Sequence, residues 1–274
     1  MSVHIVGVVL VHNEDVFVEQ AIRNVAAFCD RIHAVDHVST DGTWEILRHL
    51  ERELDNVDAR RVTHAGESHA VVEPYAGSDT WVFGVDGDEL YDPGRLVAFR
   101  ERLDAGEFSN VFKVESNVLN CVALDRGAAT ASGYLSPPSR SITKLYNFAA
   151  LDSWAGDGAE RLHGGRPVFR AGYGPDAVDN IGERLAWDKT PLRCLHACFL
   201  RRSSAEEGVD GTLARPILEE TTMHDRTWRG ALKRRLRRTP RLDESAWKRE
   251  KYMRGELVTV DASPFFAEVP QAAR

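Results

Sequence analysis

The stretch WVFGVDGDELYDP, residues 81–93, begins as an apolar strand and ends abruptly in acidic residues. Asp86, Asp88 and Glu89 bring three carboxylates to one point, where unpaired negative charges repel one another. This pattern indicates either a turn that meets a cation or a strand end whose side chains lie apart in solvent.

The sequence before this stretch alternates regularly between strand and helix patterns. Four apolar segments have the composition of buried strands, namely 4–13, 31–39, 59–65 and 80–86. Between them, apolar residues recur at helical spacing in 16–28 and 44–50, with Ser39 and Thr40 as candidate helix caps. A weakly helical stretch covers 67–77, and a helix over 93–104 follows Pro93. This order predicts parallel β-α-β units, in which ligands gather at the carboxyl ends of the strands.

Polar clusters lie at three of these predicted strand ends. They are Asn13 with Glu14, Asp36 with Asp41, and Asp86 with Asp88. Any one of them is explained by an exposed strand end. Three clusters on one edge of a sheet favour a binding site.

The pattern changes from about residue 105 onward. Four further segments have strand character, namely 110–124, 140–148, 166–173 and 193–202. Their connections are rich in Gly and Pro, so we expect a mixed, loop-rich half. Residues 211–255 are strongly charged and have a helical pattern.

Composition narrows the setting further. The chain has 274 residues, of which 43% are hydrophobic and 28% charged, which suits one large or two small globular domains. No apolar run approaches the ~20 residues that span a bilayer, and we expect no signal peptide at the first residues. The four cysteines are sparse, as in a cytoplasmic chain with reduced thiols. The net charge of -7 makes nucleic acid an unexpected partner.

The ordered motifs VLVHNED (9–15), VDHVSTDGT (35–43) and VDGDEL (85–90) resemble those of the family 2 glycosyltransferases, with His37 and Val38 as departures. The resemblance covers about residues 3–100 and is looser to about 204. It implies the GT-A fold, an α/β fold with a Rossmann-like, mostly parallel central sheet flanked by helices. The implied division within this domain is a nucleotide-sugar-binding half (1–104) and an acceptor-side half (105–205). Beyond the resemblance, the charged helical pattern predicts a C-terminal extension (206–274).

The resemblance also implies an inverting transfer of a sugar from a nucleotide-sugar donor, with Mn²⁺ or Mg²⁺. A divalent cation that bridges both phosphates stabilises the leaving nucleoside diphosphate, and hard cations prefer oxygen ligands. Asp88 would bind this cation, while Asp86 would support it or contact the ribose. Asp36 would accept hydrogen bonds from the base, and Asn13 and Glu14 would shape the floor of the pocket. Asp41 either joins this site or favours the dipole of the following helix.

The segment RCLHACFLRR (193–202) offers a further ligand. On a strand, Cys194, His196 and Cys198 would face one way, which raises zinc as one alternative. The family resemblance implies instead that His196, followed by Phe199 and Arg201-Arg202, completes the metal site. A structural histidine is the third alternative.

Two parts of the family pattern are missing. Relatives carry an Arg-Asn pair before the metal-binding strand, for which His69 or Tyr75 would substitute here. An inverting transfer also needs a carboxylate base near the acceptor hydroxyl. The Gly-rich segment 153–165 carries Asp157, Glu160 and His163, and Glu160 is slightly favoured over Asp157.

Residues 226–241 form a basic segment with an apolar stripe. Such a helix either packs by its stripe or lies peripherally on an anionic membrane, which would suit a lipid-linked acceptor. Two other functions stay open: a phosphatase of the haloacid dehalogenase type that uses Asp86 and Asp88, and a binding protein that holds a nucleotide sugar without transferring it. The sequence identifies neither the sugar nor the acceptor (a small molecule, a glycan or a lipid-linked sugar), and a homodimer stays open.

Overall fold

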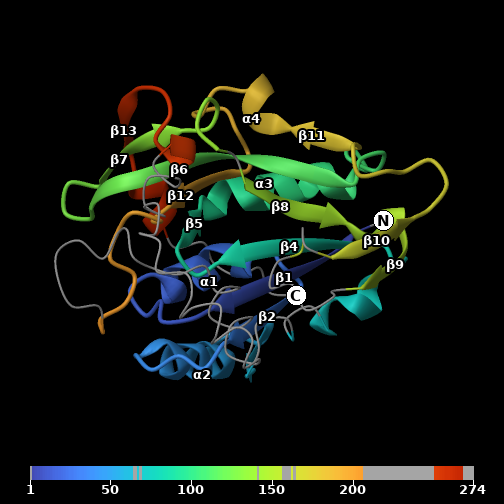
Figure 1. Cartoon of the computed structure of the whole chain (residues 1–274), viewed down its shortest axis with the longest axis horizontal. Coiled ribbons are helices and arrows are strands. Elements are labelled where there is room, and N and C mark those ends of the chain that lie inside the picture. Colours follow the sequence, from blue (N-terminus) through green and yellow to red (C-terminus); the bar gives the residue numbers. More distant parts are fainter. Residues whose placement is uncertain are drawn as a thin grey trace, which may run out of the picture.

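The computed structural model describes residues 2–63, 67, 70–140, 142–155, 162, 165–205 and 250–267. These residues form one curled sheet of 11 strands and a separate pair of strands, with the helices packed around them (Figure 1). The order along the main path of the sheet is β13-β7-β6-β8-β4-β1-β2-β3. The predicted α/β class, with a parallel first half and a mixed second half, is confirmed.

The strands are β1 (His4–Val11), β2 (Arg31–Asp36), β3 (Val57–Arg61), β4 (Thr80–Asp86), β5 (Glu89–Tyr91), β6 (Lys113–Asp125), β7 (Thr130–Leu135), β8 (Ile142–Asn147), β9 (Leu151–Ala155), β10 (Arg166–Phe169), β11 (Val178–Asn180), β12 (Arg193–His196) and β13 (Leu257–Asp261). The α-helices are α1 (Val18–Ala26), α2 (Thr43–Glu53), α3 (Pro93–Asp104) and α4 (Ile181–Arg184). Short 3-10 helices are η2 (Glu73–Tyr75), η3 (Phe148–Ala150) and η5 (Ser263–Phe266).

The first half is the predicted set of parallel β-α-β units, in which β4, β1, β2 and β3 lie side by side. Strands β1 and β2 end earlier than their apolar patterns predict. Asn13 and Val38 have positive φ angles of 54° and 50°, and this left-handed backbone cannot continue a strand. The chain therefore leaves the sheet at Val11 and Asp36.

Alternation along β4 explains how the sheet holds a core on each face. Trp81, Phe83 and Val85 pack with the buried residues of α1, α2 and α3, whereas Val82 points to the opposite face. There it packs with Trp154 and other buried residues of η3, β9 and the segment before η2. A strand that is buried on both faces carries the continuous apolar run that the sequence shows.

The helix starts follow local chemistry. Asp92 caps α3, because its carboxylate accepts a hydrogen bond from the Arg95 backbone N at 3.1 Å, and Pro93 occupies the first turn. The prediction that Ser39 or Thr40 caps α2 is wrong. The helix begins at Thr43, so Gly42 stands at the cap position, without a side-chain cap. The Ser39 hydroxyl instead accepts a hydrogen bond from the Asn13 backbone N.

The second half differs from its predicted outline at one strand that matters for the site. β12 ends at His196 rather than continuing to 202, and it lies between β6 and β5. Cys198 therefore lies beyond the strand, so the expectation that Cys194, His196 and Cys198 share one face is wrong. Cys194 is buried in the core around α1–α3.

None of the helices in the described part of the chain combines the length and the apolar character that a membrane crossing requires. The basic segment 226–241 lies outside the described residues, as does most of the expected C-terminal extension. The domain boundaries at 104/105 and 205/206 stay predictions.

Candidate functional site

Three strand ends bring the predicted polar clusters to one edge of the sheet (Figure 1). In the parallel register, Leu10 of β1 pairs with Asp86 of β4, and Val11 of β1 pairs with Asp36 of β2. The loops that follow β1, β2 and β4 therefore start side by side. The sequence predicts this juxtaposition, and the structure confirms it.

The turn between β4 and β5 holds Asp86 and Asp88 close to the β1–α1 loop. Glu89 closes the turn, because its carboxylate accepts a hydrogen bond from the Asp86 backbone N at 3.0 Å. Gly87 is required there: a Cβ at this position would clash with the Glu14 carboxylate and lie 2.6 Å from Val11 Cγ1. The absence of a side chain thus lets the acidic turn lie directly against Glu14.

Asp88 is buried and paired with a cationic side chain. Arg202 Nη1 lies 2.6 Å from Asp88 Oδ2 and 3.4 Å from Glu14 Oε1. Burial raises the pKa of Asp88, but the Arg202 guanidinium and the neighbouring His196 outweigh it, so this pKa lies below its ordinary value. Burial correspondingly lowers the pKa of Arg202, and the charges of Asp88 and Glu14 raise it above its ordinary value. Both groups are therefore charged at neutral pH.

His196 reaches the same point from β12. Its Nε2 lies 3.8 Å from Asp88 Oδ1, and its Nδ1 lies 3.0 Å from Asn120 Oδ1 on the neighbouring strand β6. The Tyr252 ring packs beside the imidazole, with 5.9 Å between ring centroids. The predicted convergence of His196 and Asp88 is thus present in the structure.

The orientation of Asn120 decides which nitrogen of His196 carries the proton. The Asn120 amide nitrogen donates to the Ser139 hydroxyl and the Arg140 carbonyl, so its oxygen is the atom that faces His196. An amide oxygen only accepts, so Nδ1 is the protonated nitrogen of the neutral ring. Nε2 then presents a lone pair toward the Asp88 carboxylate. Two electron-rich atoms that face each other in this way are stabilised by positive charge, either a proton on Nε2 or a metal cation between them.

These donors fit a divalent cation that is bound together with a substrate. Within the ranges that the structure describes, no three His, Cys, Asp or Glu side chains converge closely enough to enclose a metal. Mg²⁺ sites are, however, typically built from one or two carboxylates plus substrate phosphates. Mn²⁺ also prefers oxygen ligands, and the imidazole of histidine is a common ligand of metal ions in proteins. Asp88 and His196 would supply two such ligands.

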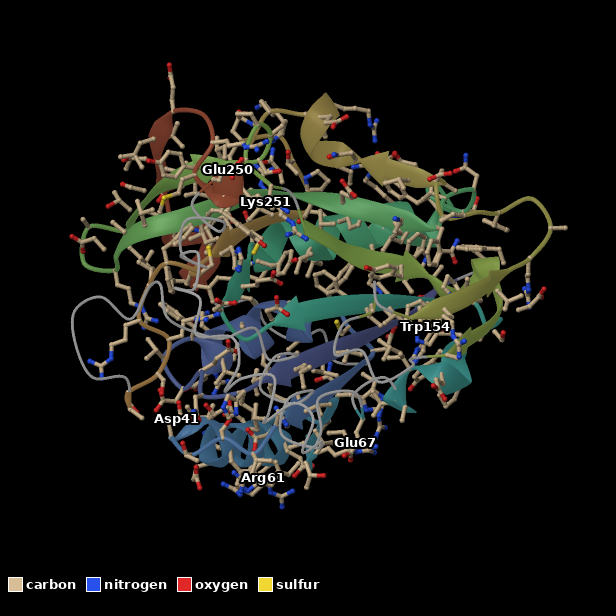
Figure 2. All side chains as sticks on the ribbon, in the orientation of Figure 1. Asp41, Arg61, Glu67, Trp154, Glu250 and Lys251 are labelled. Carbon is tan, nitrogen blue, oxygen red and sulfur yellow. The ribbon has the colours of Figure 1, made fainter. Side chains whose placement is uncertain are left out.

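Asp36 is fully buried at the end of β2 and is engaged by protein groups. Arg61 Nε donates to its carboxylate at 2.8 Å, and the Ser39 backbone N lies 3.2 Å from both carboxylate oxygens. The Arg61 guanidinium also lies over the Trp44 ring, 5.3 Å from its centroid. Figure 2 shows Arg61 beside α2, at the outer side of the sheet. Asp36 therefore holds Arg61 and the loop after β2.

Asn13 and Asp41 fasten loops rather than point into an open space. Asn13 Oδ1 accepts a hydrogen bond from the Thr40 backbone N at 2.8 Å. Asp41 accepts from the Thr43 backbone N at 3.0 Å and from the Ser203 hydroxyl at 2.5 Å. Burial raises the pKa of Asp41, but these hydrogen bonds lower it further than burial raises it.

The structure brings together Glu14, Asp86, Asp88 and His196, and places Asn13, Asp36 and Asp41 in the loops that surround them. Sequence reasoning missed three contributors: Gly87 as a packing requirement, Arg61 as the partner of Asp36, and Asn120 as the partner of His196. Arg61 and Asn120 had no local signal, because each lies on a strand that no motif marks. The predicted residues His69, Asp157 and Glu160 lie outside the described residues, as does His163.

No family model matches this chain, and no curated protein matches it. Among solved structures, the mannosyltransferase PcManGT from Pyrobaculum calidifontis, in complex with GDP-Man and Mn²⁺, is 17% identical, with 72% of this chain and 58% of that one covered and a TM-score of 0.40. TarS (residues 1–349) from S. aureus, in complex with UDP, is 15% identical, with 65% and 60% covered and a TM-score of 0.37.

Glucosyl-3-phosphoglycerate synthase from Mycobacterium tuberculosis, in complex with Mn²⁺, UDP and glucosyl-3-phosphoglycerate, is 18% identical. The match covers 42% of this chain and 44% of that one, with a TM-score of 0.33. The chain thus matches less than two thirds of each of these structures. Because all three TM-scores lie below 0.5, any functional assignment depends on the residues of this chain itself.

Proposed function

We propose that this protein transfers a sugar from a nucleotide-diphosphate donor to an acceptor nucleophile, with a divalent cation, Mn²⁺ or Mg²⁺, at Asp88 and His196. One observation carries the proposal: His196 Nε2 and Asp88 Oδ1 face each other at 3.8 Å, at the carboxyl ends of parallel strands. When bound, the cation would neutralise the charge that develops on the leaving diphosphate. The family resemblance of the three ordered motifs supports the same chemistry.

The residues around the cation position have supporting roles in this proposal. Asp86, two residues before Asp88, supports the cation or contacts the donor ribose. Asn120 holds His196 with Nε2 directed toward Asp88. Asp36 would accept hydrogen bonds from the base, and it also fixes Arg61 at the nucleoside end of the site.

The inverting course, and the base that it needs, belong to this proposal as well. Asp157 and Glu160 remain the candidates for the carboxylate that takes the acceptor proton. A soluble cytoplasmic enzyme whose segment 226–241 contacts membranes peripherally would suit a lipid-linked acceptor.

Calorimetry tests the proposal without knowledge of the sugar. The parent chain is titrated with UDP, GDP and ADP, with Mn²⁺ and with excess chelator. We expect binding of at least one nucleotide that requires Mn²⁺, and an affinity at least about tenfold lower in Asp88→Asn and His196→Ala, equivalent to about 1.4 kcal/mol or more. His49→Ala, an exposed histidine on α2, is the control and should bind like the parent.

Activity assays run beside the calorimetry distinguish the alternatives. Release of inorganic phosphate from a simple phosphate ester, without nucleotide binding, would support a phosphatase that uses Asp86 and Asp88. Tight Mn²⁺-dependent binding of a nucleotide sugar that is neither hydrolysed nor transferred to any acceptor of a broad panel would support a binding protein.

A further inference from the structure

Arg202 brings a positive charge to the carboxylates of the candidate site. Its side chain is 16% exposed, and its guanidinium contacts Asp88 at 2.6 Å and Glu14 at 3.4 Å. Asp86 adds a third carboxylate beside them. Among the described residues, Arg202 is the arginine that contacts these carboxylates, and a diphosphate that enters beside them is repelled by their negative charge.

The backbone of Arg202 is held firmly over the two loops that follow β1 and β2. Its carbonyl accepts a hydrogen bond from the Val16 backbone N at 3.0 Å. Ser203 donates to Asp41, and the Ser204 backbone N donates to Asp15 at 2.6 Å. The segment 201–204 is therefore fixed at the site, and the long side chain of Arg202 is the part that is able to change partners.

We infer that Arg202 exchanges partners during donor binding: it neutralises Asp88 and Glu14 in the empty site, and it binds the donor's diphosphate once a divalent cation is present. This inference deepens the proposed function and rests on it. The planar guanidinium fork matches a phosphate as well as a carboxylate, so the exchange replaces one charge-assisted hydrogen bond by another.

The exchange follows from the positions of the charges. Asp88 directs Oδ1 toward His196 and Oδ2 toward Arg202, so one carboxylate faces both the proposed cation position and the guanidinium. A guanidinium beside a divalent cation on the same carboxylate is repelled. The doubly charged diphosphate at the same edge offers Arg202 the replacement partner.

The inference makes a prediction with two opposite signs. Arg202→Ala removes a cation that competes for Asp88, so the affinity for Mn²⁺ alone should rise by roughly tenfold. The same variant loses a charged hydrogen-bond donor to the diphosphate, so the affinity for UDP or GDP at saturating Mn²⁺ should fall by roughly ten- to a hundred-fold. A merely structural arginine would not move the two affinities in opposite directions.

Calorimetry on the full chain measures both quantities, with Mn²⁺ alone and then with whichever of UDP and GDP the parent binds more tightly. Arg202→Lys keeps the charge but not the fork, so it should bind Mn²⁺ like the parent and the nucleotide more weakly. It also carries the test if Arg202→Ala does not fold. Arg184→Ala is the matched control, because Arg184 is an exposed arginine on α4 that pairs with Asp179, and it should change neither affinity.

The outcomes separate this inference from the proposed function. A parent chain that binds neither Mn²⁺ nor a nucleotide contradicts both. A parent that binds the nucleotide with Mn²⁺, with Arg202 variants that match it or that lose both affinities together, contradicts the inference alone. If the parent binds Mn²⁺ alone too weakly to measure, an Arg202→Ala chain that also shows no binding of Mn²⁺ alone contradicts it as well.

Discussion

At the scale of single residues, Gly87 shows how the acidic turn depends on close packing. The turn passes so near to Val11 and Glu14 that no side chain fits between them. Gly94, at the start of α3, is different, because a Cβ there would meet only Asp92 Oδ1, at an ordinary 3.7 Å. The two glycines form a natural pair for comparison.

We expect Gly87→Ala to lower the free energy of unfolding by about 1–3 kcal/mol, because the added methyl group overpacks the turn against Val11 and Glu14. Gly94→Ala should leave stability unchanged or raise it by up to about 1 kcal/mol, since alanine favours a helix. Urea denaturation of the parent and both variants measures the difference. Equal stability of the parent and Gly87→Ala would contradict this, because it would mean that the turn accommodates a methyl group beside Val11 and Glu14.

The buried carboxylate of Asp36 is the second residue whose environment determines its role. Arg61 and the Ser39 backbone N both depend on it for a partner. The pair is half open to solvent on the arginine side, where 40% of the Arg61 side chain is exposed. Removing one partner of the Asp36–Arg61 pair should therefore lower the free energy of unfolding by less than in a fully buried ion pair.

Asp36→Ala should lower the free energy of unfolding by about 1–3 kcal/mol, because it leaves a buried backbone N without its acceptor and Arg61 without its anion. The exposed Asp55→Ala is the control, with an expected change within about 0.5 kcal/mol. Chemical denaturation gives both values. A variant as stable as the parent that binds nucleotide poorly would instead support a direct contact between Asp36 and the base.

At the scale of elements, His33 links β2 to its neighbours. Its ring nitrogens lie 3.3 Å from Asp58 on β3 and 3.3 Å from the Tyr75 hydroxyl in η2. Burial lowers the pKa of His33 and outweighs the carboxylate of Asp58, which raises it. The imidazole is therefore neutral in the folded chain at a pH where it is already charged in the unfolded chain.

This shift predicts the sign of a pH effect. Because the folded-state pKa of His33 lies below the unfolded value near ~6.5, its stabilising contribution is present above that pH and is lost as the pH falls below it. Stability of the parent and of His33→Gln, measured by urea denaturation from pH 7.5 to pH 5, should converge toward acid pH. If the stability difference between the two proteins stays constant with pH, the predicted pKa shift is wrong.

At the scale of the whole molecule, the segment 257–266 joins the end of the described chain to its first helix. β13 pairs with β7, and the buried Asn24 of α1 donates to the carbonyls of Phe265 and Tyr91 at 2.8 and 2.7 Å. The Arg193 guanidinium lies over the Phe265 ring, 5.2 Å from its centroid. The segment 257–266 is thus held against α1 and β7.

Asn24→Ala should lower the free energy of unfolding by about 1–3 kcal/mol and loosen the C-terminal segment, because two buried carbonyls lose their donor. Limited proteolysis with mass spectrometry, run beside chemical denaturation, measures both effects. New cleavage after residue 250 at a rate above that of the parent is the expected result. Arg52→Ala, an exposed change at the end of α2, should leave the cleavage pattern as it is.

The amino-acid sequence by itself determined β4, the start of α3 and the place of the acidic turn between them. The run TWVFGVD became β4 over the predicted residues, and Pro93 marked the start of α3, because these features depend on neighbours a few positions away. The rule that ligands gather at the carboxyl ends of parallel strands then placed Asp36, Asp86 and Glu14 near one another.

Only the tertiary structure decided which groups meet at that edge. Arg202 contacts Asp88 across 114 positions, and Asn120 orients His196 across 76. The family resemblance marked Arg202 but not its partner, and no motif marked Asn120. β12 gained its place from pairing with β5 and β6, so its end could not be predicted from its own apolar pattern. Local patterns specify whether a segment is a strand or a helix, whereas partners depend on packing between distant segments, which is settled when the whole chain folds.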